Sequence, residues 1–159
     1  MIMLQQRIGK FLSYLEQQIN PAQEEIQDIY YIKTEQRFDP SRPLDLSGWS
    51  RMNNRELWGG HREYYWFSMK AVIPEAFAGK AVCFQVLTGK EGGWDATNPQ
   101  FLCYVDGTAR QGLDVNHREV LLTENAQPGQ AYEIVLSAFT GDQNFNLKMD
   151  VSLKVLDRE

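Results

Sequence analysis

The end of the chain reads Phe145-Asn146-Leu147-Lys148-Met149-Asp150-Val151-Ser152-Leu153-Lys154-Val155-Leu156. Apolar side chains occupy every second position from Leu147 to Val155, and polar side chains occupy the positions between them. Side chains of a β-strand point alternately to the two faces of a sheet, so this period of two predicts a strand. One face of that strand should contact a hydrophobic core, and the other should face water.

Six earlier segments carry a similar signal. They are rich in β-branched and aromatic residues, and most are bounded by turn residues such as glycine, proline and aspartate. Their ranges are 29–37, 62–73, 80–87, 101–105, 119–122 and 132–139. Short strands that follow one another without intervening helices predict a mainly β fold, an antiparallel β-sandwich. Among sandwiches, we favour the jelly-roll or galactose-binding-like type.

The first part of the chain has a different period. Its apolar residues are Leu4, Ile8, Phe11, Leu12, Leu15 and Ile19. Steps of three and four residues predict an N-terminal α-helix over residues 3–19, which Asn20-Pro21 ends. Its polar face is mostly glutamine, which favours packing on this domain or a neighbouring one over binding to a membrane surface. We therefore expect a helix and linker over residues 1–27 and a β-sandwich accessory domain over 28–159.

Composition and charge exclude several classes of function. With 159 residues, 43% of them hydrophobic, the chain can bury the core of one domain without a disulfide or metal. Its formal net charge is −5 and its basic residues are scattered, so we expect no nucleic acid partner. No export signal precedes the strands, and no segment reaches the ~20 apolar residues of a membrane span. The sequence predicts a cytoplasmic protein without membrane contact, and it leaves a homo-oligomer open.

The two cysteines lie in apolar segments. Cys83 follows Ala-Val and precedes Phe, and Cys103 follows Phe-Leu and precedes Tyr. A free cysteine in such surroundings behaves as a small apolar residue, and a reducing cytosol disfavours disulfides. We predict two buried, reduced thiols and no catalytic cysteine.

The densest polar cluster is Gln111-Gly112-Leu113-Asp114-Val115-Asn116-His117-Arg118-Glu119. As a metal site it lacks a third ligand, because His61 is the only other histidine and no further ligand is suitably spaced. The simpler interpretation is a loop in which Asp and Asn accept backbone hydrogen bonds while His and Arg fix a turn or a domain contact. Contact with a ligand or a second domain stays open for Asp114, Asn116, His117 and Arg118.

Two tryptophans stand in glycine-rich loops. Trp58 precedes Gly59 and Gly60, and Trp94 follows a pair of glycines. Glycine permits positive φ and close backbone approach, so both indoles could sit on shaped loops and stack on a sugar ring. Burial in the core, or a mobile loop for Trp94, is the alternative. Trp66, within an aromatic run, is expected in the core or on the sheet.

We expect no catalytic residue and no metal ligand in this chain. Glycosidases need two carboxyl groups facing each other across a cleft about 5 to 10 Å wide. The available acids are Asp95, Asp106, Asp114 and Glu119, and their spacing pairs no two of them. Sequence signatures of a serine nucleophile, a phosphate loop and a Cys-x-x-Cys site are also missing.

Several motifs occur in order along the chain. They are Leu57-Trp58-Gly59-Gly60, Tyr65-Trp66-Phe67 followed by Ile73-Pro74, Tyr104-Val105-Asp106-Gly107, and the polar cluster extended to Val120. Residues 88–100 add Trp94-Asp95-Ala96-Thr97-Asn98-Pro99. Together they resemble the N-terminal domain of a glycoside hydrolase family 38 α-mannosidase, of the bacterial branch.

This resemblance implies a large cytoplasmic enzyme that removes terminal α-linked mannose from glycans with retention of configuration. In that family, zinc or another divalent metal and an aspartate nucleophile lie in an α/β barrel that follows this domain. The barrel is absent from these 159 residues, so we expect an inactive fragment, partnered by the barrel, that meets mannosides through the parent enzyme.

Two functions remain open. The first is a non-catalytic accessory domain that braces the barrel. Its candidate interdomain or substrate-rim contacts are Trp58, Gly59, Gly60, Trp94, Asp114, Asn116, His117 and Arg118. The second is a carbohydrate-binding module with sugar affinity of its own, for which the fold alone is a weak argument.

Overall fold

The computed structural model describes residues 22–90, 99–142 and 146–156. The helix predicted over residues 3–19 and the tryptophan at position 94 lie outside the described residues. Within the described ranges the chain forms strands and one short 3₁₀ helix, η1 (Glu75–Phe77), which confirms the mainly β prediction. No helix in these ranges is long and apolar enough to cross a bilayer.

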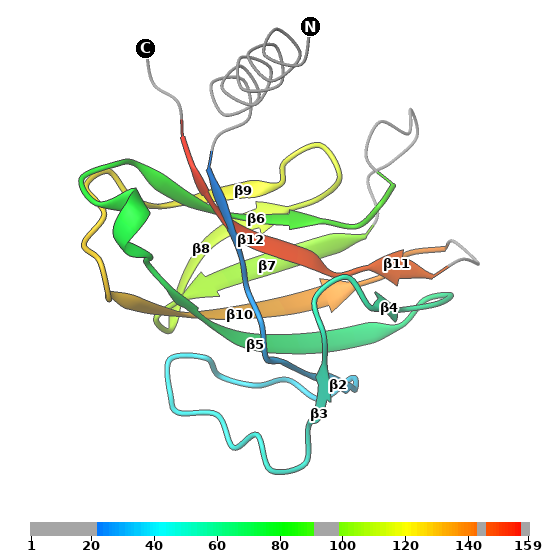
Figure 1. Ribbon diagram of the computed structural model, residues 1–159. Coiled ribbons are helices and arrows are strands. Elements are labelled where there is room, and N and C mark those ends of the chain that lie inside the picture. The colour runs from blue at the N-terminus through cyan, green and yellow to red at the C-terminus, as the bar shows by residue number, and fades with distance from the viewer. Residues whose placement is uncertain (1–21, 91–98, 143–145, 157–159) are drawn as a thin grey trace, which may run out of the picture.

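Two antiparallel sheets face each other (Figure 1). The smaller one has the order β1 (Gln23–Glu25), β12 (Asp150–Val155), β6 (Val82–Leu87) and β9 (Glu119–Thr123). The larger one has the order β3 (Ser50–Met52), β2 (Ile29–Lys33), β5 (Tyr64–Val72), β10 (Ala131–Phe139), β7 (Gln100–Val105) and β8 (Thr108–Leu113). A short pair joins β4 (Leu57–Trp58) to β11 (Leu147–Lys148). The predicted antiparallel sandwich is therefore confirmed.

Each of the predicted strand ranges contains a strand, but β1, β3, β4 and β8 were missed. The reason is clearest for β8, the outermost strand of the six-stranded sheet. Its residues are exposed except for Leu113, so it shows no alternation of apolar and polar side chains. An edge strand is held by backbone pairing to one neighbour, here β7, and that pairing leaves no signature in local sequence.

The core lies between the two sheets. Phe67, Ile134 and Leu136 point inward from the six-stranded sheet, and Phe84 and Leu153 from the four-stranded sheet; all are at most 1% exposed. The predicted inward set of the last segment is also confirmed, because its four residues from 147 to 153 are buried in the same cluster. The opposite face of this segment, expected to face water, is only partly exposed to solvent, because Ser152 is buried as well.

Both cysteines are free and buried, as predicted. Burial raises the pKa of Cys83 and of Cys103 to about 12, because a thiolate in these surroundings would lose its hydration. For Cys83 the negative charge of Glu119 adds to the effect. Neither thiol is therefore suited to nucleophilic chemistry.

The outer face of the six-stranded sheet is covered in part by the long segment that links β2 to β3 (Figure 1). The ring of Phe38 from this segment meets Trp66 of β5 edge-on, with 5.4 Å between ring centroids. Trp66 also stacks against Tyr104 of β7 at 6.2 Å. Trp66 is therefore buried on the side of the sheet that faces away from the main core.

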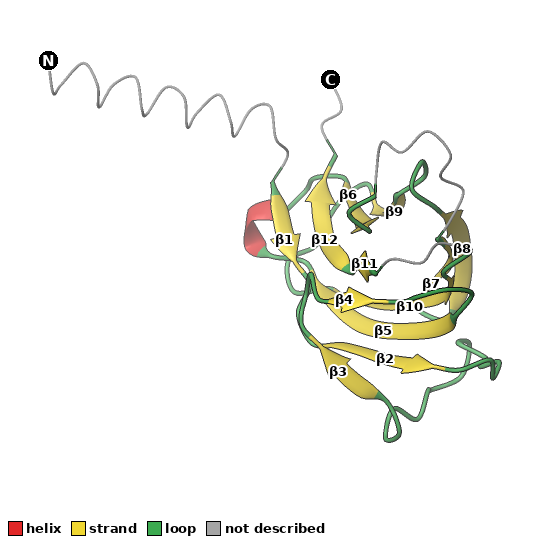
Figure 2. Cartoon of the chain, turned by 90° about the vertical axis from the view of Figure 1, so that its right-hand side faces the viewer, coloured by secondary structure: helices red, strands yellow, loops and turns green. Residues whose placement is uncertain are grey.

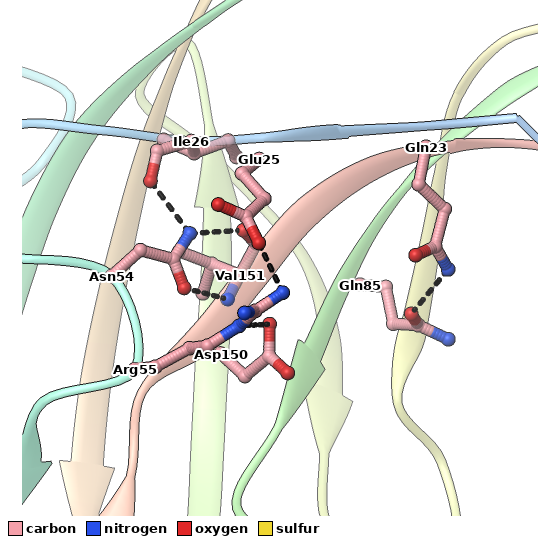
Figure 3. A network of polar contacts seen from close by, with 8 residues as sticks. All are labelled: Gln23, Glu25, Ile26, Asn54, Arg55, Gln85, Asp150 and Val151. Carbon is pink, nitrogen blue, oxygen red and sulfur yellow. Dashed lines mark hydrogen bonds and ion pairs between the residues drawn. The ribbon is translucent and has the colours of Figure 1, made fainter.

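A polar cluster ties the first and last described strands together (Figure 3). Arg55 pairs with Glu25 of β1, and its Nε lies 3.9 Å from a carboxylate oxygen of Asp150 in β12. Further along β1, Gln23 donates to the side-chain oxygen of Gln85 at 3.5 Å. Because β1 also pairs with β12 along its length, the sheet already includes residues 23–25, ahead of the expected boundary at residue 28.

Candidate functional site

Loops from both sheets gather at one end of the sandwich. In the strand register, Tyr64 at the start of β5 lies opposite Phe139 at the end of β10, and Phe139 lies opposite Gln100 at the start of β7. The end of β8 and the starts of β9 and β12 lie at this same end. It is the right-hand end in Figure 1 and faces the viewer in Figure 2. We call it the loop end; it carries both predicted site segments, 58–60 and 114–118.

Trp58 was expected on a loop, but the structure places it in β4 with its indole in the core and 5% of the residue exposed. Its ring packs edge-on against Tyr65 and Phe67, with centroids 5.2 and 4.8 Å away. The indole Nε1 donates to the carbonyl oxygen of Lys148 at 3.0 Å, so its one polar group is satisfied inside the protein. This indole offers no free face to a sugar.

Two glycines follow Trp58, and the first of them makes the turn toward β5 possible. Gly59 has φ +82°, and a Cβ there would lie 3.0 Å from the Thr140 methyl group. A Cβ on Gly60 would lie 2.4 Å from a carboxylate oxygen of Glu63. Gly59 therefore has a conformational role, whereas a Cβ on Gly60 would meet only the movable end of the Glu63 side chain.

Residues 114–118 form a tight turn between the two sheets. Asp114 Oδ1 accepts the backbone N–H groups of Asn116 at 2.7 Å and of His117 at 2.8 Å. Partial burial by itself would raise the pKa of Asp114, but these two hydrogen bonds, together with the hydrogen bond and charge of the His117 side chain, hold the pKa below its ordinary value. The simpler interpretation of this segment, an aspartate that fixes a turn, is the one that the geometry supports.

The other side chains of this turn differ in exposure. The His117 side chain is 71% exposed, with Nδ1 3.3 Å from Asp114 Oδ1, and Asn116 is exposed too. Arg118 is half-buried, and its carbonyl oxygen accepts the N–H of Val86 at 3.0 Å, which joins the turn to β6. Across the described ranges, no three His, Cys, Asp or Glu side chains cluster closely enough to hold a metal. Asn116 and His117 are thus the predicted residues that face outward at the loop end.

A shallow hollow that was not predicted from the sequence lies on the outer face of the six-stranded sheet, beside the loop end. We call it the aromatic hollow. Its floor is formed by Tyr64, Trp66, Gln100, Leu102, Ser137 and Phe139, and residues 34–37 form one wall. Its volume is about 490 Å³. Tyr64 stacks on Phe139 with 4.7 Å between centroids, yet 45% of Tyr64 remains exposed.

The wall of this hollow is fixed to its floor by hydrogen bonds. The Trp66 indole Nε1 donates to the Gln36 carbonyl oxygen at 3.1 Å, and Thr34 N–H donates to the Tyr64 carbonyl oxygen at 3.0 Å. The Thr34 hydroxyl oxygen accepts the N–H of Gln36 at 3.0 Å. The hollow is thus held in one shape without a ligand.

One sequence signal could have located the hollow. The run Tyr64-Tyr65-Trp66-Phe67 places large rings on both faces of one strand. Tyr65 and Phe67 fill the main core, so Tyr64 and Trp66 need a second apolar environment on the outer face. Which residues from β7 and β10 join them could not be known without the strand register.

A larger hollow, of about 720 Å³, lies toward the other end of the outer face, beneath residues 40–46. Two of its carboxylates are already engaged. Asp28 pairs with Arg51, and Asp106 accepts the N–H of Glu133 at 2.9 Å. Its aromatic side chain, Tyr30, lies beneath the Arg51 guanidinium, 5.4 Å from the ring centroid. Lys70 and Glu133 also line this hollow, but its lining holds one aromatic side chain, against Tyr64, Trp66 and Phe139 in the aromatic hollow.

Comparison with known protein families finds no match, and no curated protein matches the sequence. Solved structures do share the fold. β-Glucuronidase 2 of Bacteroides uniformis has a TM-score of 0.60 at 14% identity, over 85% of this chain and 18% of its own. The β-glucuronidase of Faecalibacterium prausnitzii has a TM-score of 0.53 at 15% identity, over 74% of this chain and 21% of its own. The β-glucuronidase of Ruminococcus gnavus, in complex with D-glucuronic acid, has a TM-score of 0.53 at 10% identity, over 86% of this chain and 30% of its own.

These likenesses establish the fold, and this chain spans less than a third of each of those proteins. They also correct the expected family. The similar structures are β-glucuronidases, one described as belonging to glycoside hydrolase family 2, so the assignment to the family 38 α-mannosidases is wrong. The motifs behind it include turns that the backbone demands: Asp106-Gly107, for example, takes φ of 49° and 82° between β7 and β8.

Proposed function

We propose that this chain is a non-catalytic accessory domain of a glycoside hydrolase and that it braces a catalytic domain of the same polypeptide. The observation that carries the proposal is the sandwich itself, which matches 18% to 30% of β-glucuronidase chains while covering most of this one. Those neighbours are glycosidases, and a domain of this size is a small part of each. The mannosidase specificity and the zinc expected with it came from the corrected family assignment and are not carried further.

The chemistry of the loop end supports a non-catalytic role. Glycosidases place two carboxyl groups where both can reach one glycosidic bond. Four carboxylates that the structure describes at this end are engaged within the domain: Glu63 with Lys33, Asp142 with Arg62 at 3.3 Å, Glu119 with Lys154 at 3.0 Å, and Asp114 in its own turn.

The 114–118 turn suits a domain contact. Its shape is set by the carboxylate of Asp114 and by backbone hydrogen bonds, while Asn116 and His117 project outward. Both residues are exposed, and the His117 ring lies 3.3 Å from Asp114, so we expect their replacement to change the fold little. Their partner would be the surface of the catalytic domain.

Two measurements test the proposal. The isolated chain should show no hydrolysis of aryl β-glucuronides or other aryl glycosides, with or without divalent metal. In the full polypeptide, the pair Asn116→Ala and His117→Ala should lower thermal stability or activity, since interface hot spots commonly contribute about 2 kcal/mol or more. The same pair should leave the melting temperature of the isolated chain unchanged.

Val72→Ala is the matched control, because Val72 is exposed at the opposite end of β5. This substitution should change neither the melting temperature of the isolated chain nor the thermal stability and activity of the full polypeptide. Turnover by the isolated chain would overturn the proposal, and so would a stop codon directly after Glu159 in the gene.

A further inference from the structure

We propose that the aromatic hollow binds the pyranose ring of a neutral carbohydrate, which would give this domain a ligand of its own beyond an accessory role. The site is formed on three adjacent strands. Tyr64, Phe139 and Gln100 lie side by side in register across β5, β10 and β7, and Trp66, Ser137 and Leu102 form the next row on the same face. This places three aromatic side chains, an amide and a hydroxyl within one hollow.

The stacked pair provides a platform for a sugar ring. Tyr64 and Phe139 are stacked at 29° to one another, so each ring covers one face of the other and the exposed part of Tyr64 is left for a ligand. An aromatic face packs well against the C–H groups on one side of a pyranose. Because Tyr64 and Leu102 remain 45% and 40% exposed, the platform is open to solvent. A volume of about 490 Å³ lies within the usual range of small-molecule sites.

The polar groups around the platform match hydroxyls. Amide and hydroxyl side chains such as those of Gln36, Gln100 and Ser137 can both donate and accept hydrogen bonds, as sugar hydroxyls do. Glu35 and Arg37 on the wall carry opposite charges, so the wall favours neither an anion nor a cation. These features favour a neutral sugar over an acidic one. They also favour it over a purely hydrocarbon ligand, which would leave the amides unpaired.

The hollow is rigid before any ligand binds. The bonds from Trp66 to Gln36, from Gln36 to Thr34 and from Thr34 to Tyr64 hold the wall against the floor. Binding then requires little ordering of the protein, which lowers its entropic cost. An open site with few polar contacts should still bind weakly, in the millimolar range, as expected for about 4 kcal/mol of binding free energy.

The test is an NMR titration of the ¹⁵N-labelled chain with methyl hexopyranosides and short oligosaccharides of glucose, galactose and mannose, up to about 50 mM. D-Glucuronic acid serves as the acidic comparison. The Trp66 indole N–H lies in the floor and reports on the site directly, as do the backbone amides of Gln100 and Phe139. We expect these signals to shift with a neutral sugar while signals at the far end of the sheet stay in place.

Three variants make the result specific. Tyr64→Ala should weaken binding about tenfold by removing half of the platform, and Tyr64→Phe should keep binding within about threefold. Val72→Ala, on the same strand but outside the hollow, should bind as the unaltered chain does. Unchanged thermal melting of each variant shows that it is folded.

The inference is overturned if no sugar shifts the signals of the hollow, or if Tyr64→Ala binds as tightly as the original chain. It is also overturned if these signals respond to the catalytic domain and not to sugars, because the hollow would then be a domain interface. A failure of the hollow to bind sugar does not contradict the proposed accessory role. Turnover by the isolated chain would remove the accessory role without affecting the hollow.

Discussion

The side chain of Asn54 pairs with the backbone of Val151 as a neighbouring strand would. Its Nδ2 donates to the Val151 carbonyl oxygen at 2.7 Å, and its Oδ1 accepts the Val151 N–H at 3.3 Å (Figure 3). The same Nδ2 donates to the Ile26 carbonyl oxygen at 2.7 Å. One amide therefore joins the segment after β3 to the first and last described strands of the sandwich.

Replacing Asn54 by alanine should lower the free energy of unfolding by about 2 to 3 kcal/mol, because the Ile26 carbonyl and the Val151 N–H lose this partner, while the Val151 carbonyl keeps only the Ile26 N–H. Urea denaturation of the chain measures the change. Asn53→Ala is the control, since the Asn53 amide is exposed and bonds only to the neighbouring Glu56 side chain; its effect should stay below about 0.5 kcal/mol. Equal effects of the two substitutions would contradict the role assigned to Asn54.

Trp58→Ala should destabilise the domain by about 3 to 5 kcal/mol, the usual cost of removing a buried tryptophan side chain. This differs from what a tryptophan on a binding loop would show, namely an unchanged fold. Leu57→Ala, on the same short strand, should change stability by less than about 0.5 kcal/mol because Leu57 is 60% exposed. A melting temperature that Trp58→Ala leaves unchanged would show that the indole is not part of the core.

Neither cysteine should react with a maleimide while the chain is folded. With pKa values of about 12, the thiolate fraction at pH 8 is on the order of 10⁻⁴, and both side chains are buried. Mass spectrometry should show an unlabelled chain under native conditions and two labels in concentrated urea. Rapid native labelling of either thiol would be inconsistent with this structure.

The turn at Asp114 should make a pH-dependent contribution to stability. The pKa of Asp114 is lower in the folded chain than in the unfolded chain, so its ionised form favours folding. This contribution is present above the ordinary aspartate value of about 3.9 and is lost as the pH falls through the lower folded value. Asp114→Ala should thus reduce the free energy of unfolding by about 1 kcal/mol at pH 7, from two lost hydrogen bonds, and by less near pH 2.

Asp114→Asn separates charge from geometry, because its amide oxygen can still accept the same two backbone N–H groups. At pH 7, Asp114→Asn should lower the free energy of unfolding by less than Asp114→Ala does. Because the amide does not ionise, position 114 should then make no pH-dependent contribution in acid. An NMR titration of the Asp114 carboxyl carbon measures the pKa of Asp114 directly. A pKa at or above the ordinary aspartate value would refute the assignment.

Much of this fold could be predicted from local sequence. Alternation of apolar and polar residues marked the last strand, and β-branched and aromatic runs marked the other long strands, because a strand with one buried face must repeat with period two. The same logic placed Cys83 and Cys103 in the interior. The turn at Asp114 was also accessible, because an aspartate that accepts nearby backbone N–H groups acts within a few residues.

Other features depend on contacts between distant parts of the chain. The edge strands β1 and β8 form because a neighbour offers free backbone groups, which a local pattern does not reveal. Trp58 is buried because β4 pairs with β11 about 90 residues later, so that a tryptophan beside two glycines lies in the core and not on a loop. The aromatic hollow exists because the register of β5, β10 and β7 brings Tyr64, Phe139 and Gln100 side by side. A shift of one residue in any of these pairings would turn the same side chains to the opposite face, and that choice is made only when the sheet assembles.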